Sequence, residues 1–439
     1  MGYRISSPLL IVVFLFSSLC VGETIDREAF VEAFIKKADI VRAFDERIAG
    51  AEADVSRAKW QYFPKLKLIF GVAPFPRYTY NPDNVDWDKS YYIGDIGIAL
   101  RARGEFSLPI YTFGKITNAI DAAEKGADAR RAEKEISLLS LRKEASSFYY
   151  TYLMMNDVEN ILDLSLEKVA EAEEKLLQWL DENKEGASQS DLIKLRIEKE
   201  RLLAGKDKVT ATKKSLEYLF EKILGPGYVL KDTFMFTVSF SYTLEQLEAH
   251  LVGDSPYQRF VTNGIGALES LYKFEKSQFF PNLGIAGDYR IDYTSSVDDR
   301  GYPLPSSPYN GYGGEIGIGL ELNLNFLDQV ARMRKAKAEW EAKRYEASFA
   351  REKAIVELRR AYGELKALEQ QVEHAKKANK LAKGWMTTEL LNYGVGMFST
   401  RDLVDAVKAF VENEYQLITA MYEYNMKVEE VLQKAGIPQ

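Results

Sequence analysis

The sequence has very little of the chemistry on which enzymes and metal sites depend. Its 439 residues include one cysteine, Cys20, and two histidines, His250 and His374. The histidines are far apart in the sequence, and neither belongs to a motif with metal-ligand spacing. Cys20 lies in a segment that we expect to be removed on export, so the mature chain has no thiol chemistry. The sequence therefore predicts no enzyme, and no catalytic, metal-binding or cofactor-binding residues.

Clustered positive charge and long apolar runs are also missing. The net charge is −7 and well mixed, and no basic stripe with interleaved aromatic residues indicates a nucleic-acid partner. The apolar run Leu9–Phe16 follows Arg4 and precedes small residues near Gly22. This layout predicts a secretory signal peptide over residues 1–22. No later run reaches the length of a transmembrane helix, so a membrane-spanning part would have to consist of strands.

Proline is absent from two long tracts, which lie between Pro109 and Pro226 and between Pro308 and Pro438. Proline costs about 3 kcal/mol inside a helix, so both tracts can hold very long helices. Apolar residues recur there in alternating steps of three and four, the heptad spacing of coiled coils. Examples are Leu138, Leu141, Ala145, Phe148, Tyr152 and Met155, and in the second tract Leu358, Ala361, Leu365, Leu368 and Val372. We expect long helices over about 112–183 and 327–393, each followed by another helix, over about 191–224 and 402–434.

The two halves of the chain repeat each other. The motif FPKL at Phe63–Leu66 returns as FPNL at Phe280–Leu283, and IYTFGK from Ile110 corresponds to FLDQVA from Phe326. The turn that begins at Gly186 corresponds to the one that begins at Gly396. Three ordered matches at nearly constant offset indicate duplication. We predict a first repeat over 23–224 and a second over 256–436, joined by an inter-repeat equatorial segment over 225–255.

Each repeat also contains two predicted strands, over about 65–72 and 93–108 in the first and about 282–293 and 315–325 in the second. In the last of these, every second residue is a branched aliphatic and the residues between are Gly, Glu or Asn. The aliphatic positions are Ile316, Ile318, Leu320, Leu322 and Leu324. A water-soluble sandwich would show the same alternation. The uninterrupted apolar faces, and long polar loops that carry aromatic residues from Tyr78 to Tyr92 and from Tyr302 to Tyr312, favour the wall of an outer-membrane barrel. On this interpretation the five aliphatic residues face outer-membrane lipid.

Four strands cannot form a barrel alone. An open sheet edge does not occur in lipid, because each unpaired backbone group there costs several kcal/mol, and the smallest single-chain barrels have eight strands. The chain must therefore oligomerise. Two copies would give eight strands and three would give twelve, and the sequence pattern does not distinguish a dimer from a trimer.

The signal peptide, the duplicated strand–strand–long-helix plan and the two Gly…Asp-Leu turns resemble the TolC family of outer-membrane efflux channels. The segment Val395–Ala406, VGMFSTRDLVDA, is similar to that family's turn at the periplasmic tip of the channel. The resemblance implies a mostly α fold with a β-barrel portion. It implies a homotrimer whose twelve-stranded barrel, with four strands from each chain, continues into an α-helical coiled-coil tunnel.

The same resemblance implies a function. The chain would be a passive export duct of a tripartite efflux or type I secretion system, in the outer membrane of a Gram-negative bacterium and with a large periplasmic portion. A periplasmic adaptor protein would dock it to an inner-membrane transporter. The alternative is a soluble periplasmic coiled-coil scaffold or adaptor protein, whose strands would form a soluble sandwich.

Two acidic residues match the positions that form acidic rings at the periplasmic constriction of this family, Asp402 and Asp405. Three symmetry-related carboxylates in a narrow pore would concentrate cations and repel anions. Asp402 also fits an N-terminal cap or a first-turn acid that complements the helix dipole. The sequence has Phe398 where the family model has arginine, so the contacts that lock the gate must differ. The turn residues form a predicted adaptor-docking tip, with a plain loop as the alternative: Gly394, Gly396, Ser399, Gly186 and Ser188.

Overall fold

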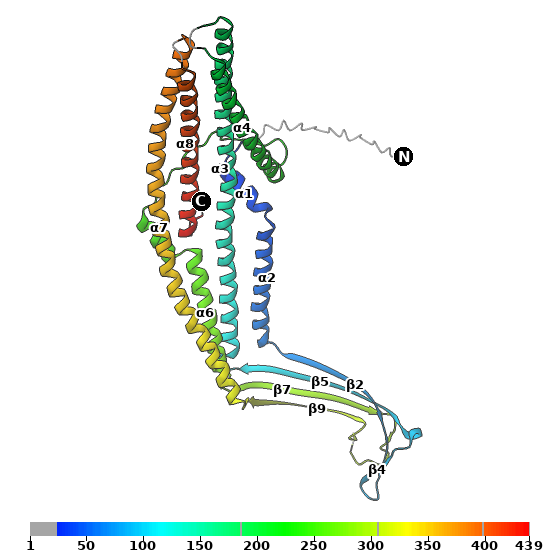
Figure 1. Cartoon of the computed structure of the whole chain (residues 1–439). Helices are drawn as coiled ribbons and strands as arrows, with labels where there is room; N and C mark the ends of the chain where they lie inside the picture. The colour runs from blue at the N-terminus through cyan, green and yellow to red at the C-terminus, as the bar shows by residue number, and fades with distance from the viewer. Residues whose placement is uncertain (1–23, 185–186, 305–306, 397–398, 439) are drawn as a thin grey trace, which may run out of the picture.

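Two very long helices run from one end of the molecule to its four-stranded sheet (Figure 1). The computed structural model describes residues 24–184, 187–304, 307–396 and 399–438; the predicted signal peptide, Gly186 and Phe398 lie outside the described residues. Helix α3 (Lys115–Asp181) has 67 residues and α7 (Phe326–Gly394) has 69. Each is about 100 Å long at a rise of 1.5 Å per residue. Both lie in the proline-free tracts, so every residue in them can keep its backbone hydrogen bond.

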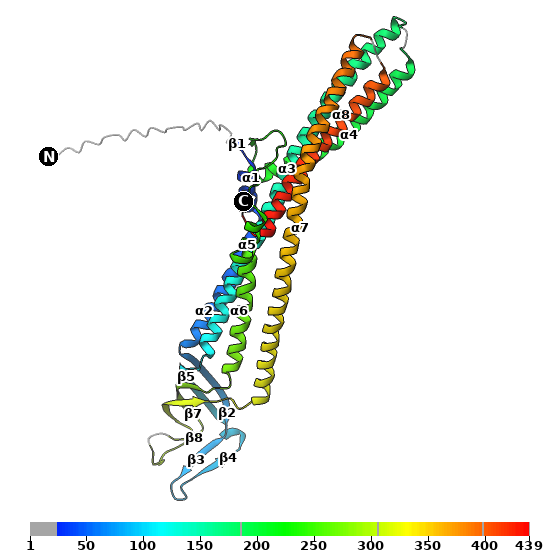
Figure 2. The ribbon, with the colours of Figure 1, turned by 90° about the vertical axis from the view of Figure 1, so that its left-hand side faces the viewer.

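Shorter helices cover these two rods in two halves (Figures 1 and 2). In the half far from the sheet, α4 (Gln189–Leu224) packs on α3, and α8 (Thr400–Ala435) packs on both α3 and α7. In the half next to the sheet, α2 (Asp39–Lys59) packs on α3, and α6 (Pro256–Ser277) contacts both α3 and α7. The short helices α1 (Arg27–Lys37) and α5 (Leu244–Gly253) lie near the junction between the halves.

Most of the predicted heptad positions on α7 are buried, whereas on α3 the prediction was less accurate: Ala145 is buried, but Phe148, Tyr152 and Met155 are only half-buried. On α7 the buried seam consists of Leu358, Ala361, Leu365 and Val372, and on α8 of Leu403, Val407, Phe410 and Val428. Where α1 meets the rods, Phe30 stacks on Phe220 at 4.2 Å between ring centroids, beside the fully buried Tyr149 and Tyr150. The apolar periodicity of the sequence therefore places the helix faces that pack together.

Several of the described helices begin at polar side-chain caps, whereas α2, α3 and α7 have none. Ser188, Ser255 and Ser399 each accept a hydrogen bond from the backbone N–H three residues ahead, at the start of α4, α6 and α8. Thr243 and Gln246 form a reciprocal capping box at α5. These side chains satisfy backbone donors that have no partner inside the helix.

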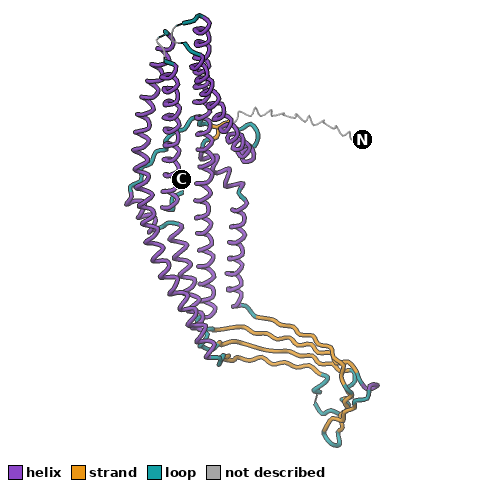
Figure 3. Tube along the Cα trace, viewed as in Figure 1, coloured by secondary structure: helices purple, strands orange, loops and turns teal. Residues whose placement is uncertain are grey.

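One antiparallel sheet has the strand order β2-β5-β7-β9 (Figure 3). Its strands are β2 (Lys65–Phe75), β5 (Gly97–Tyr111), β7 (Asn282–Thr294) and β9 (Gly311–Glu321). Beyond the end far from the helices lies a small sheet of β3 (Arg77–Asn81), β4 (Asp86–Ser90) and β8 (Val297–Asp298), in the order β4-β3-β8. A third, two-stranded sheet pairs β1 (Thr24–Ile25) with β6 (Val229–Leu230).

The strands differ from the predicted ranges where a partner strand stops. Residues Ile93–Asp95 form a 3-10 turn, and β5 begins at Gly97, opposite Phe75 of β2. The residue after Phe75 is Pro76, which has no N–H to offer to a continuing ladder. The prediction of a strand from residue 93 was therefore wrong by four residues.

The same cause ends β9 early. Its last residue, Glu321, pairs with Asn282, and the residue before Asn282 is Pro281. Beyond Glu321 the chain turns locally, and the side chain of Asn323 accepts a hydrogen bond from the N–H of Asn325 at 3.0 Å. The strand predicted over 315–325 instead covers Gly311–Glu321. Two of the five predicted lipid-facing residues, Leu322 and Leu324, consequently follow the strand rather than belong to it.

The inter-repeat segment between α4 and α5 is held against the middle of the helical rod. The buried side chain of Asn425, on α8, accepts a hydrogen bond from the N–H of Val238 at 3.0 Å and donates one to the carbonyl of Phe236 at 2.6 Å. Tyr149, on α3, donates its hydroxyl to Asp232 at 2.8 Å. Burial and this hydrogen bond both raise the pKa of Tyr149, so the phenol stays neutral.

No described helix is both long enough and apolar enough to cross a bilayer.

Candidate functional site: an apolar sheet face and a helical tip

The strand register places most of the large apolar side chains of all four strands on one face of the sheet; Ile69, which pairs with Arg103, lies on the other. Opposed pairs on this face include Val72 with Leu100, and Ile285 with Ile318. We call it the apolar sheet face; its members are Leu66, Leu68, Phe70, Val72, Ile98, Leu100, Ala102, Phe106, Leu108, Leu283, Ile285, Tyr289, Ile291, Tyr293, Tyr312, Ile316, Ile318 and Leu320. Side chains alternate between the two faces of a strand, so this set follows directly from the register.

The apolar sheet face is uncovered. Ile316, Ile318 and Leu320 are 74%, 73% and 68% exposed, and Leu66 on the opposite edge strand is 78% exposed. All four long strands lie in one layer, so the described residues do not form the sandwich expected of a soluble scaffold. A contiguous apolar surface of this extent marks contact with a membrane or with another protein.

The opposite face of the sheet is charged. Lys67 lies 3.6 Å from Glu105, and Arg103 lies 3.5 Å from Asp288, each between side-chain nitrogen and oxygen. Arg101 and Asp292 form a further pair at 3.7 Å. These exposed pairs contribute little stability, but they show that this face is suited to water.

Exposed aromatic residues form a belt where the strands meet the helices. The belt consists of Trp60, Tyr62, Phe63, Tyr111, Phe113, Phe280 and Phe326, all exposed. Within it, Phe113 stacks on Phe280 at 5.8 Å between centroids. Aromatic rings of this kind favour a membrane–water boundary. This belt was not predicted from the sequence, although the FPKL, FPNL and IYTFGK motifs that reveal the duplication carry most of it.

The aromatic residues of the loops at the far end of the sheet divide into two groups. Tyr91 and Tyr92 are exposed in the loop, and Tyr312 is exposed within β9. The rest pack on one another beside the small sheet: Phe75, Tyr78, Tyr80, Trp87, Tyr302 and Tyr309. Tyr80 is only 7% exposed. The expectation that the loop aromatic residues as a group decorate a membrane boundary was therefore wrong for this second set, which forms a small core.

At the other end of the molecule, the α3–α4 and α7–α8 turns lie side by side (Figure 1). Trp179, near the end of α3, packs against Tyr393, near the end of α7, at 5.0 Å between ring centroids. The ammonium of Lys184 lies 4.5 Å from the centre of the Trp179 ring, and that of Lys175 lies 3.5 Å from the carbonyl oxygen of Gly394. These residues join the two turns. Sequence reasoning missed them, and an aromatic residue near the end of each long helix was the available signal.

The first turn is organised around Ser188. Its hydroxyl oxygen accepts a hydrogen bond from the N–H of Asp191 at 3.2 Å, and its hydroxyl donates to the Asp191 carboxylate at 2.6 Å. The ammonium of Lys194 lies 2.9 Å from the same carboxylate. Partial burial opposes ionisation of Asp191, but the Ser188 and Lys194 contacts outweigh it and lower its pKa below the ordinary value.

The second turn places both candidate gate residues on α8. Ser399 caps this helix by accepting from the N–H of Asp402 at 3.3 Å, so Asp402 is an exposed first-turn acid. Asp405 is also exposed, with its carboxylate 3.8 Å from the guanidinium of Arg401. Residues three apart share a helix face, so both carboxylates lie on one face of α8.

Gly396 has a backbone conformation that few other residues adopt. Its φ is +83°, and a Cβ added there would collide with the side chain of Lys184. Gly394, Gly396, Ser399 and Ser188 lie at one end of the molecule, within two adjacent turns.

Over the four described ranges, no group of three or more His, Cys, Asp and Glu side chains could hold a metal ion.

No protein-family model matches this sequence, and no curated protein sequence matches it either. Solved structures of bacterial channels match nearly all of it. CusC, from a study of folding and transmembrane channel formation, is 12% identical, has a TM-score of 0.76, and is matched over 94% of this chain and 92% of its own. The outer membrane protein VceC of Vibrio cholerae is 13% identical, with a TM-score of 0.73 and coverage of 93% and 96%.

The open state of the Neisseria gonorrhoeae MtrE outer membrane channel is 12% identical to this chain, with a TM-score of 0.74 and coverage of 94% and 89%. At such identities the likeness concerns the fold. The chain has the fold of outer-membrane channel proteins, and the fold expected from the resemblance to the TolC family is confirmed for a single subunit.

Proposed function

We propose that three copies of this chain form an export channel in the outer membrane of a Gram-negative bacterium. The sheets of the three copies close into a twelve-stranded barrel, and the helices continue it as a tunnel through the periplasm. One observation carries the proposal. A four-stranded sheet has an uncovered apolar face, a charged opposite face and two edge strands, β2 and β9, that have no partner within the described chain.

The strand count supports closure between copies. With four antiparallel strands per chain, β9 of one copy runs antiparallel to β2 of the next, which is the pairing an all-antiparallel barrel needs. Closure removes every unpaired edge from the lipid. The four strands have 11, 15, 13 and 11 residues, enough to cross a bilayer at a tilt. The number three comes from the family resemblance, and the outer-membrane channel folds of the solved structures favour it.

The two faces of the sheet then have separate roles. The apolar sheet face contacts outer-membrane lipid through residues that include Ile316, Ile318 and Leu320, with the aromatic belt at the periplasmic boundary. The charged face lines the water-filled lumen. Because such a lumen offers few contacts to cargo, the protein acts as a passive duct and not as an enzyme, and its partners supply the energy.

The helical tip is the proposed gate and docking end. Asp402 and Asp405 lie on one face of α8 with exposed carboxylates, as a ring of three copies would require. The adjoining turns, with Gly394, Gly396 and Ser399 in one and Ser188 in the other, present the surface for a periplasmic adaptor that connects to an inner-membrane transporter. About 100 Å of continuous helix separates this tip from the sheet, which is the length scale of a periplasmic tunnel.

Conductance in a planar lipid bilayer tests the proposal. Purified oligomers should produce discrete channels of small, cation-selective conductance, and preparations unfolded by heat should produce none. A companion measurement transfers the protein from detergent into buffer, where a barrel with an apolar belt precipitates. A protein that stays monodisperse in buffer and forms no channels would be a scaffold, and the channel proposal would then be rejected.

A further inference from the structure

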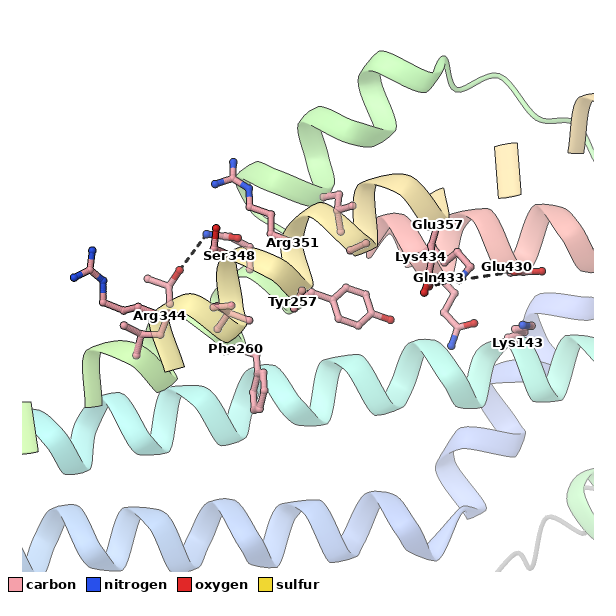
Figure 4. Close-up of a pocket in the computed structure, with 18 residues that line it drawn as sticks. Lys143, Tyr257, Phe260, Arg344, Ser348, Arg351, Glu357, Glu430, Gln433 and Lys434 are labelled. Carbon is pink, nitrogen blue, oxygen red and sulfur yellow. Dashed lines mark hydrogen bonds and ion pairs between the residues drawn. The ribbon is translucent and has the colours of Figure 1, made fainter. Parts of the chain in front are cut away.

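A groove of 630 Å³ opens between parts of α6 and α7, close to the point where α8 ends. Its α6 wall carries Tyr257, Phe260, Val261 and Ile265, and its α7 wall carries Ala347, Ala350 and Ala354. In Figure 4 the rings of Tyr257 and Phe260 lie between α7 and α3. The groove is in the helical part of the molecule, away from the sheet and its aromatic belt.

The small side chains of α7 leave this groove open. Ala347, Ala350 and Ala354 are three and four residues apart, so they share one face of the helix. Alanine side chains reach only a short way toward the aromatic wall of α6. The part of the groove between these alanines and the aromatic residues of α6 offers water few hydrogen bonds, although Gln258, Thr262, Ser348 and Gln433 also belong to the lining. Its size falls in the range of small-molecule binding sites.

Positive charge exceeds negative charge in the lining of this groove, which also includes the carboxylates of Glu357 and Glu430. Its lining includes Lys143, Arg344, Arg351 and Lys434. The Lys434 ammonium is neutralised by Glu357 at 3.1 Å and by Glu430 at 3.9 Å.

The other three cations, Lys143, Arg344 and Arg351, form no ion pair with any carboxylate in the part of the chain that the structure describes. Arg344 instead lies over the ring of Trp340, at 5.3 Å. Figure 4 shows Arg344 and Arg351 at the edge of the groove, with their guanidinium groups directed away from the aromatic rings. The groove thus has apolar residues on its α6 and α7 walls and positive charges at its rim that attract anions.

We propose that this groove binds a single-chain anionic amphiphile, such as a fatty carboxylate of about ten to twelve carbons, which a groove of this size can hold. The alkyl chain lies between the alanine face of α7 and the aromatic wall of α6. The carboxylate lies at the rim, where Arg344 and Arg351 can fold back over it on their flexible stems. The inference does not depend on the proposed channel function, because it rests on the walls and charges of one subunit.

Photolabelling of the intact oligomer in lipid nanodiscs tests this proposal. The probe is dodecanoic acid with a diazirine on its chain, and the labelled peptides are mapped by mass spectrometry. We expect adducts on the α6 and α7 peptides that line the groove. Dodecanol with the same diazirine should label these peptides about tenfold less, because it lacks the charge that the arginines bind.

Variants connect the labelling to this groove. Arg344→Gln combined with Arg351→Gln should reduce labelling by the acid to the level of the alcohol. The matched control, Arg334→Gln combined with Lys337→Gln, removes two positive charges from the same helix outside the groove and should leave labelling unchanged. Filling the groove by Ala350→Trp should abolish labelling by both probes.

Three outcomes would overturn the proposal. They are equal labelling by acid and alcohol, undiminished labelling of the double arginine variant, and no groove adducts in the assembled oligomer. The last would mean that a second copy covers the groove. Arg344 and Arg351 are exposed, so the double arginine variant should fold. It therefore tests the proposal even if Ala350→Trp does not fold.

Discussion

Replacing Ile318 by lysine, and separately its neighbour Gly317 by lysine, places the same charge on opposite faces of the same strand. Ile318 lies on the apolar sheet face between Ile316 and Leu320 and is 73% exposed in the subunit. Gly317 points to the charged face, and a Cβ added there meets no atom within 4 Å. The two variants therefore introduce the same side chain into the same strand on opposite faces, one toward lipid and one toward water, and Ile318→Lys in addition removes an isoleucine.

The expected cost follows from this geometry. A lysine on the lipid face of a barrel costs about 2–4 kcal/mol at the bilayer midplane, hence about 6–12 kcal/mol for three copies. Ile318→Lys also loses the transfer of an isoleucine side chain out of water, about 1.5–3 kcal/mol per copy. Gly317→Lys adds a charge to a hydrated face and should cost little. In a water-soluble protein the ranking would reverse, because Ile318→Lys would remove exposed apolar surface.

The assay is outer-membrane fractionation followed by gel electrophoresis without heating, which detects assembled oligomers. Ile318→Lys should strongly reduce membrane oligomers, and Gly317→Lys should resemble the unmodified protein. Normal oligomers of Ile318→Lys, or equal damage from Gly317→Lys, would refute the assignment of the apolar sheet face to lipid.

The tip gives four further predictions. Changing Asp402 and Asp405 to alanine should increase single-channel conductance and lower its cation selectivity in planar bilayers; an unchanged conductance would remove them from the gate. Ser188→Ala should cost about 1 kcal/mol of tip stability, measured as faster proteolysis of the α3–α4 turn, with Ser188→Asn as the control that keeps a cap. Because the folded pKa of Asp191 is depressed, its contribution to stability is present above the ordinary aspartate pKa of about 3.9. That contribution should be lost as the pH falls further, through the depressed value, and an Asp191→Asn variant should not show this acid dependence. Gly396→Ala should destabilise the second turn by about 1–2 kcal/mol, since its φ is left-handed, and equal proteolysis rates in variant and parent would contradict this.

Local information sufficed for much of the architecture. Helix hydrogen bonds join residues four apart, so the absence of proline and the heptad spacing predict α3 and α7 to within three residues of their ends. Side-chain alternation is equally local, which is why the apolar positions Ile316, Ile318 and Leu320 fall on one face as predicted. Ser188 and Ser399 were not predicted as helix caps, although a cap acts within three residues of itself and is therefore a local signal.

The remaining features depend on partners that are distant in the sequence. A strand ends where its neighbour stops, so Pro76 and Pro281 set the ends of β5 and β9. Leu322 and Leu324 were predicted to belong to the last strand, but β7 has no residues left to pair with them. The contact between Trp179 and Tyr393 likewise needs two turns to come together. The sequence by itself determined the long helices and the two-faced strands, because these arise from short-range periodicity. Only the tertiary structure decided how the strands align into one uncovered sheet and how the two turns meet, because these depend on long-range pairing.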